Sequence, residues 1–311
     1  MILTVTPNSA IDWALFIPHF KWGGSLQADK AVWGMAGKST GAAWILGKLG
    51  VDTIAMGFAA GTSGEKMIEL LEQKNVETDF IWVGGETRLN VHVLDRESGR
   101  QTLLAVDTLE VASVHIERFM KRFAKKLKQA KVLITGGSLP AGLTPDFFRE
   151  IITAAKEKGV PVVLDSGFPH LADVLLASPD LIKLNCADLS SVVGHVVDSV
   201  KEAYQAARAI NEKYTTQVIV TLDIGGTLAV LKESAYRIPT LKVEQIENTA
   251  GAEGGILAGI AYALANQFPL EDGIRLGTAA SSAVTMTPAA ANFCKDDVER
   301  LLSKVELIPY P

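Results

Sequence analysis

The sequence predicts an α/β fold built on one doubly wound, mainly parallel sheet, with a second, small β-sheet that forms a lid. From Lys131 onward, short apolar runs alternate with longer amphipathic segments, a pattern typical of parallel strands joined by helices. In the N-terminal third, short strand-like segments occur without helices between them. The first pattern predicts the large sheet, and the second predicts the small one.

The predicted strands of the large sheet are rich in leucine and β-branched residues, as expected of strands covered on both faces. They have the sequences VLITG, PVVLD, LIKLN and QVIVTL and begin at Val132, Pro161, Leu181 and Gln217. A helix is predicted over 145–158, between a threonine–proline start signal and a terminating glycine. Right-handed connections between such elements give one doubly wound sheet.

Four segments predict the small sheet, at 11–18, 26–33, 88–94 and 101–106. The first two precede a helix predicted around 42–49, and the last two follow Val83. The lid is therefore expected to come from insertions at about 11–33 and 86–108 within a single domain of residues 1–311. No internal repeat or low-complexity linker divides the chain.

Two further segments predict helices. The basic stretch at 119–128 has apolar residues at helical spacing, so its charges are expected on a solvent-facing surface, although an anionic partner is the alternative. The apolar stretch at 254–270 is short for a membrane span and predicts a buried helix.

The composition excludes several classes of protein. With 311 residues, 48% of them hydrophobic, the chain is long enough for a large core, and its net charge of −5 offers no concentrated basic surface for nucleic acid. Cys186 and Cys294 lie far apart without metal-ligand spacing, and the N-terminus lacks the layout of a signal peptide. We therefore expect a cytoplasmic protein with no membrane or nucleic-acid partner.

The tetrapeptide Gly37-Lys38-Ser39-Thr40 invites comparison with a Walker A phosphate loop. That loop requires a glycine five residues before Gly37, where Val32 stands, so the comparison fails. A nicotinamide-dependent dehydrogenase is disfavoured because no Gly-x-Gly-x-x-Gly turn follows the first strand.

The segment GMAGKSTGAAWILGKLG resembles instead the first signature of the PfkB family of carbohydrate kinases. Gly37 and Lys38 match that signature, whereas Ala36, Ser39 and Gly41 replace two glycines and an asparagine. Five other stretches are similar to the family's motifs in the same order: TPNSAID at 6–12, GETRLNV at 85–91, GGSLPAGL at 136–143, LIKLNCADL at 181–189 and NTAGAEGGILAG at 248–259. The resemblance covers nearly the whole chain and implies a ribokinase-like fold, nearest the 1-phosphofructokinase and tagatose-6-phosphate kinase branch.

This resemblance implies that a sugar or sugar phosphate binds at Asp12, Lys38, Gly41, Arg88, Asn90 and Ser138. Arg88 and Asn90 lie two apart on a predicted strand, so both project to one face, where a guanidinium and an amide could bind a phosphorylated sugar. Four of these residues also have a structural alternative: a turn cap for Asp12, a surface ion pair for Arg88, a solvated ammonium for Lys38 and a tight turn for Ser138.

The resemblance also implies a nucleotide site for ATP with Mg²⁺. Its expected nucleotide-binding residues are Asn185, Thr221, Asp223, Gly226 and Asn248, and its expected metal-side residues, acting through water, are Asp165 and Asp188. Capping or solvation is the alternative for the two metal-side acids. At position 223 an aspartate replaces the family's usual glycine and would repel phosphates nearby.

The largest departure from the family lies in the second signature. The family's Gly-Ala-Gly-Asp, which supplies an anion hole and a general base, corresponds here to Gly251, Ala252, Glu253 and Gly254. The base position thus holds glycine, and an anion-hole position holds a carboxylate that opposes the transferring charge. The lid segment at 103–110 also departs from the family's sugar-facing turn.

Two functions remain open. The first is an ATP-dependent carbohydrate kinase, a phosphotransferase acting on an alcohol group, with Glu253 as a substitute base. The second is a pseudokinase that binds a sugar phosphate or nucleotide without turnover. A homodimer is expected through the small sheet, which leaves a face or edge open, with Val32, Trp33, Val91 and Val93 shared between the copies.

Overall fold

The computed structural model describes residues 1–165, 170–222 and 226–311. Within them, ten strands form the large sheet in the order β16 (Ile308–Pro309), β15 (Ala235–Ile238), β14 (Gly226–Val230), β13 (Gln217–Leu222), β12 (Leu181–Asn185), β11 (Val162–Asp165), β10 (Val132–Gly136), β1 (Ile2–Thr6), β4 (Thr53–Ala59) and β5 (Glu77–Trp82). The strands from β5 to β13 are parallel, whereas β14, β15 and β16 are antiparallel additions. The prediction of a mainly parallel sheet is confirmed.

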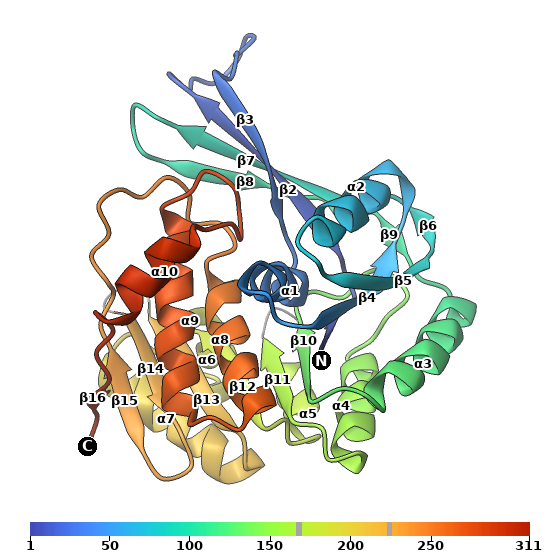
Figure 1. The fold of residues 1–311 in the computed structure, drawn as a ribbon, viewed down its shortest axis with the longest axis vertical. Coiled ribbons are helices and arrows are strands. Elements are labelled where there is room, and N and C mark those ends of the chain that lie inside the picture. The colour runs from blue at the N-terminus through green and yellow to red at the C-terminus, as the bar shows by residue number, and fades with distance from the viewer. Residues whose placement is uncertain (166–169, 223–225) are drawn as a thin grey trace.

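Helices cover both faces of this sheet (Figure 1). One face packs against α1 (Lys38–Leu49), α2 (Gly61–Glu72), α8 (Glu253–Asn266), α9 (Leu270–Thr285) and α10 (Lys295–Leu302). The other face packs against α3 (Ser113–Leu127), α4 (Asp146–Glu157), α5 (Leu171–Leu175), α6 (Cys186–Val193) and α7 (Val200–Tyr214). Each face has its own apolar core, which explains why the central strands lack a polar side.

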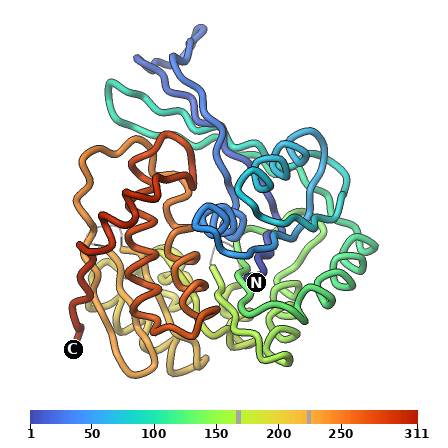
Figure 2. The backbone as a smooth tube through the Cα atoms, viewed as in Figure 1, coloured from blue at the N-terminus to red at the C-terminus, as the bar shows by residue number. Residues whose placement is uncertain are grey.

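The smaller sheet has the order β3 (Lys30–Met35), β2 (Ala10–Ile17), β7 (Arg88–Asp95) and β8 (Gln101–Leu104). It extends away from the layered body (Figure 2). Two short strands, β6 (Gly84–Gly85) and β9 (Leu109–Glu110), pair with each other, and they come just before β7 and just after β8 in the sequence. Strand β3 begins later than the predicted 26–33, and the chain ahead of it turns through Gly23 and Gly24, both at positive φ.

The predicted helices form with small shifts at their ends. Helix α1 begins at Lys38, ahead of the predicted 42–49, and α8 ends at Asn266 because Gln267 adopts a left-handed conformation. Helix α3 buries Phe119, Phe123 and Leu127, as the amphipathic pattern predicts. No helix among the described ranges is long and apolar enough to span a bilayer.

The parallel strands bring the predicted site together. Strands β1, β10, β11 and β12 end at Thr6, Gly136, Asp165 and Asn185, all on the carboxyl edge of the large sheet. Helices α1 and α8 begin near the same edge and contact β1 and β10. Ligands of open α/β sheets bind at this edge.

Candidate functional site

A cavity of about 440 Å³ lies where the smaller sheet meets the carboxyl edge of the large sheet. Its lining includes all six residues predicted for the sugar site, namely Asp12, Lys38, Gly41, Arg88, Asn90 and Ser138. The lining also includes Gly251 from the turn before α8, and Glu253 and Gly254 from the first turn of that helix. We call this space the sugar cavity.

The paired strands β2 and β7 form one wall of the sugar cavity. Asp12 on β2 is paired with Asn90 on the parallel strand β7, and the Asn90 amide donates a 2.9 Å hydrogen bond to the Asp12 carboxylate. Nε2 of His92 lies 3.1 Å from the other oxygen of Asp12. Because alternate residues of a strand share a face, Arg88, Asn90 and His92 all reach the cavity. Asp12 is buried and held in a fixed orientation.

Arg88 lies at the mouth of the same wall. Its guanidinium donates to the Asn8 carbonyl at 3.1 Å and lies 3.5 Å from the Asp107 carboxylate, which is mostly exposed. Burial lowers the pKa of Arg88, and the carboxylates of Asp107 and Asp12 oppose that shift. The Asn8 amide donates to both Asp107 and Ser138, at 3.0 and 2.9 Å, and so ties the turn after β10 to this wall.

Several buried polar atoms around the cavity have no hydrogen-bond partner among the described residues. They include Nε of Arg88, Oδ1 of Asn90 and Oδ1 of Asn8. Buried polar groups are nearly always bonded in native proteins, so a cluster of unsatisfied donors and acceptors indicates a ligand or bound water. Because these atoms include both a cationic donor and neutral acceptors, they suit an anionic ligand with several hydroxyl groups.

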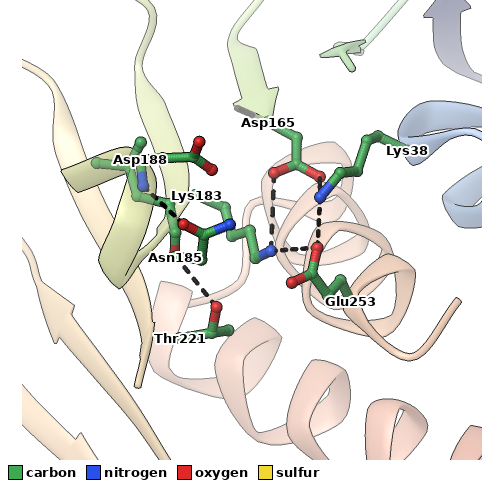
Figure 3. Close-up of polar contacts among 8 residues, drawn as sticks. Lys38, Asp165, Lys183, Asn185, Asp188, Thr221 and Glu253 are labelled. Atoms are coloured by element: carbon green, nitrogen blue, oxygen red, sulfur yellow. Dashed lines mark hydrogen bonds and ion pairs between the residues drawn. The ribbon is translucent and has the colours of Figure 1, made fainter. Parts of the chain in front are cut away.

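At the inner end of the cavity, two lysines and two carboxylates form a compact cluster (Figure 3). Oε2 of Glu253 lies 2.5 Å from Nζ of Lys38 and 2.7 Å from Nζ of Lys183. Asp165 lies behind them, 3.6 Å from Lys38 and 3.8 Å from Lys183. We call these four residues the lysine–carboxylate cluster.

The burial of this cluster determines its electrostatics. Lys183 and Asp165 are fully buried, so the Lys183 ammonium requires counter-ions close by. Burial by itself raises the pKa of the Glu253 carboxyl, but the charges of Lys183 and Lys38 outweigh burial and lower this pKa to about 2. Burial lowers the pKa of Lys38, yet Asp165 and Glu253 together raise it above its ordinary value. At neutral pH the Glu253 carboxyl is therefore ionised and the Lys38 amine is protonated.

The predicted catalytic residues lie in the turn before α8 and at the start of that helix. The N–H groups of Ala252, Gly254 and Gly255 donate within the turn, to the carbonyl oxygens of Thr249, Gly251 and Ala252. Glu253 is the first residue of α8, where the helix dipole favours a carboxylate. The position expected to bind a transferring phosphoryl group therefore carries a negative charge.

Gly254 packs directly against α1. A Cβ built at Gly254 would lie 3.1 Å from the carbonyl carbon of Gly41 and 3.2 Å from the amide nitrogen of Ala42. Two of the positions that depart from the family, 41 and 254, thus meet at one helix crossing. An aspartate at 254 would require the two helices to move slightly apart.

A second cavity, of about 330 Å³, lies on the other side of Glu253 and includes Thr221 and Gly226, two of the predicted nucleotide residues. Thr249 and Glu253 line both cavities. Asn248 is buried, with its amide bonded to the Pro288 carbonyl and to the Ala250 N–H, so its contacts fix the turn. Asp223 lies outside the described residues.

The predicted metal residues do not form a cage of protein ligands among the described residues. Asn185 caps α6 by accepting a 2.7 Å hydrogen bond from the N–H of Asp188, while Asp165 faces two lysines. Across the described ranges, no three His, Cys, Asp or Glu side chains gather around a common point. Magnesium usually keeps several waters and needs only one or two protein carboxylates beside nucleotide phosphates, so water-mediated binding at Asp165 and Asp188 stays a prediction.

Two site residues, Lys183 and His92, were missed by the sequence prediction. Lys183 is a lysine within an otherwise apolar, buried strand, which is unusual enough to indicate a paired charge. His92 follows Arg88 and Asn90 at the spacing of a strand face. Both signals are present in the sequence, but neither shows which carboxylate lies beside Lys183 or His92.

Comparison with known proteins agrees with this geometry. Residues 9–297 match the model of the pfkB family of carbohydrate kinases. The 1-phosphofructokinase of Bacillus subtilis is 28% identical over 307 residues, and the tagatose-6-phosphate kinase of Staphylococcus epidermidis is 28% identical over 313 residues, each with 99% of both chains covered. The structure of phosphofructokinase-2 from Escherichia coli matches with a TM-score of 0.86 at 25% identity, over 97% of this chain and 98% of that one. The expected ribokinase-like fold is confirmed. The chain therefore belongs to the pfkB family of carbohydrate kinases.

Proposed function

We propose that this protein binds a phosphorylated sugar in the sugar cavity and that its phosphoryl transfer is lost or severely slowed. The observation that carries the proposal is the double ion pair of Glu253 with Lys38 and Lys183. It makes the only carboxylate of the altered signature a counter-ion rather than a base. The proposal thus favours the pseudokinase over the active kinase.

The chemistry of the cavity supports a sugar phosphate as the ligand. Asp12, Asn90 and His92 offer acceptors and donors for sugar hydroxyls, and Arg88 offers a cation for a phosphate. Relatives include a 1-phosphofructokinase and a tagatose-6-phosphate kinase, so phosphorylated ketohexoses are the first compounds to test.

Two features oppose turnover. A general base is most effective when its pKa lies near the working pH, whereas that of Glu253 is about 2. In addition, Lys38 and Lys183 are already neutralised by carboxylates, so they contribute little positive charge toward a transition state.

The active-kinase alternative requires Glu253 to leave both lysines and to face the sugar hydroxyl. ATP and Mg²⁺ would then be the co-substrates, as the family resemblance implies. In that kinase, Asp165 and Asp188 would hold Mg²⁺ through water, as the resemblance implies. A cytoplasmic location and a homodimer remain predictions.

The test is a product-detected phosphoryl-transfer assay beside a binding titration, both on the same panel of ketohexose phosphates with ATP and Mg²⁺. We expect saturable binding of at least one sugar phosphate without a phosphorylated product. Turnover at an ordinary kinase rate would exclude the proposal, and so would a failure to bind every sugar phosphate in the panel.

A further inference from the structure

His92 lies in the middle of the wall that the smaller sheet contributes to the sugar cavity. On β7 it is paired with Ala14 of β2 on one side and with Leu103 of β8 on the other. Its side chain is 12% exposed and lines the cavity beside that of Asn90. The backbone of His92 therefore cannot withdraw from the cavity without breaking the strand pairing on both sides.

The ring of His92 has no hydrogen bond at Nε2 that would fix its protonation state. Nε2 lies 3.1 Å from Oδ2 of Asp12, but the two groups do not meet in hydrogen-bond geometry, and Nε2 is a buried atom without such a partner among the described residues. The other oxygen of Asp12 already accepts a 2.9 Å hydrogen bond from Asn90. Histidine is the side chain whose charge changes most readily near neutral pH, so the surrounding charges decide whether this ring carries a proton.

Five charged groups lie in the cavity or at its mouth, and their balance leaves a deficit of positive charge. Lys38 is paired with Glu253, and Arg88 lies 3.5 Å from Asp107. Asp12 is a third carboxylate, and among the described residues of the lining only the histidine can supply a further positive charge. While the histidine is neutral, two cations face three carboxylates, and this balance disfavours an anionic ligand.

We propose that His92 takes up a proton when a sugar phosphate binds, and that the imidazolium supplies the positive charge that an anionic sugar requires in this cavity. The proton comes from solvent and stays on the ring, between the Asp12 carboxylate and the ligand. Because neighbouring negative charge favours protonated histidine, the binding of the ligand and of the proton strengthen each other. His92 is thus a specificity-determining residue. This inference rests on the proposed function, which assigns a phosphorylated sugar to the cavity.

The first test counts protons by calorimetry at pH 7, with the sugar phosphate that binds best, in buffers of different ionisation enthalpy. We expect the parent to take up at least about 0.3 proton per site more than His92→Gln, whose amide cannot be protonated. The phosphate of the ligand contributes to both titrations, so the difference reports the ring. The matched control is His19→Gln, which removes an exposed histidine beside Glu97 and should leave the proton uptake unchanged.

The second test follows affinity with pH. The parent should lose its advantage over His92→Gln as the pH rises, so the ratio of their affinities should fall at least about threefold from pH 6 to pH 8. His92→Lys carries a permanent cation, and its binding should persist at pH 8, where that of the parent has weakened. A purely structural role of the ring would not produce this dependence on pH.

Nuclear magnetic resonance gives an independent answer that needs no variant. At constant pH 7, one of the five histidine ring signals should move toward its protonated position when the sugar phosphate is added. The proposal is overturned if no histidine signal moves in this way, or if the parent and His92→Gln bind the ligand with equal proton uptake. Equal uptake would leave the proposed function standing, whereas a failure of every sugar phosphate to bind would remove both.

Discussion

Glu253 shows how one side chain changes the chemistry of a site on a ribokinase-like fold. In the family signature this position is a glycine, so its backbone approaches the transferring group without a side chain. Here a carboxylate reaches the ammonium groups of Lys38 and Lys183, which are supplied by α1 and β12. A fully buried lysine without a close anion is costly, so Lys183 strongly favours this position of Glu253.

This electrostatic role predicts a pH dependence of stability. The pKa of Glu253 falls from its ordinary 4.5 to about 2 in the folded protein, so its stabilising effect is fully present above about pH 4.5 and is lost as the pH falls toward 2. Glu253→Gln lacks this effect at every pH. The difference in unfolding free energy between parent and variant should therefore shrink between pH 5 and pH 2 in urea titrations.

Glu150→Gln on α4 is the control for that experiment, because it removes an exposed carboxylate. It should change the unfolding free energy by less than about 0.5 kcal/mol at each pH. A parent-to-Glu253→Gln difference that stays constant over the whole range would mean that the lysines do not hold Glu253 in solution.

Arg88 is the residue that most directly tests the sugar cavity. Arg88→Ala removes a half-buried cation, and a charge-assisted hydrogen bond is worth about 1.5 to 3 kcal/mol, so we expect at least about tenfold weaker binding of the best sugar phosphate. Arg122→Ala, which removes an exposed cation on α3, should have no effect on binding. Equal affinities for the parent and Arg88→Ala in calorimetry would show that Arg88 does not bind the phosphate group of the sugar.

At the scale of elements, the site depends on how closely α8 packs. Gly255 and Gly259 on α8 face α9, and a Cβ built at Gly259 would overlap the backbone of Gly273 and Gly277. Gly254 meets α1 at a similar crossing. Small residues thus allow three helices to converge behind the turn that carries Glu253.

This packing predicts the effect of a single methyl group. Gly259→Ala gains helix propensity but forces two backbones apart, so we expect a net loss of about 2 kcal/mol or more in unfolding free energy. Gly84→Ala has open space around its Cβ and should change the free energy by less than about 0.5 kcal/mol. Urea unfolding checks both, and equal effects of the two substitutions would refute the close crossing.

The elements were largely predictable from sequence, whereas the cluster was not. Strands such as β10 and β12 are short apolar runs, and α4 has clear start and stop signals, so local physics determines them. The meeting of Lys183 with Glu253 depends on tertiary packing of segments far apart in the chain. Motif comparison identified Glu253 as anomalous, but it could not show which cations neutralise it.

At the scale of the whole molecule, the smaller sheet presents an apolar face away from the sugar cavity. One row runs across all four strands in register, through Trp33, Trp13, Val91 and Leu104. The two tryptophan rings are stacked, with centroids 5.5 Å apart, and Trp33 and Leu104 are exposed. Val32, which was also predicted to be shared between copies, packs with Ala14 and Phe16 on the opposite face of the sheet.

This row predicts how copies of the chain associate. We expect the parent protein to be a dimer in light scattering at micromolar concentration, and Trp33→Asp to shift it toward a monomer by placing a charge in an apolar interface. Leu176→Asp, at a more exposed apolar position after α5, serves as the control and should leave the dimer intact. A monomeric parent would contradict the prediction.

The most direct test of the central claim, that Glu253 is a counter-ion and not a base, is the rate of phosphoryl transfer from ATP with Mg²⁺ to the sugar phosphate that binds best. We predict that the parent and Glu253→Gln are equally slow, at least about 10²-fold below the ordinary kinase range of about 1 to 100 s⁻¹. A parent within that range, together with a loss of about 10²-fold or more in Glu253→Gln, would contradict the claim and make Glu253 the working base.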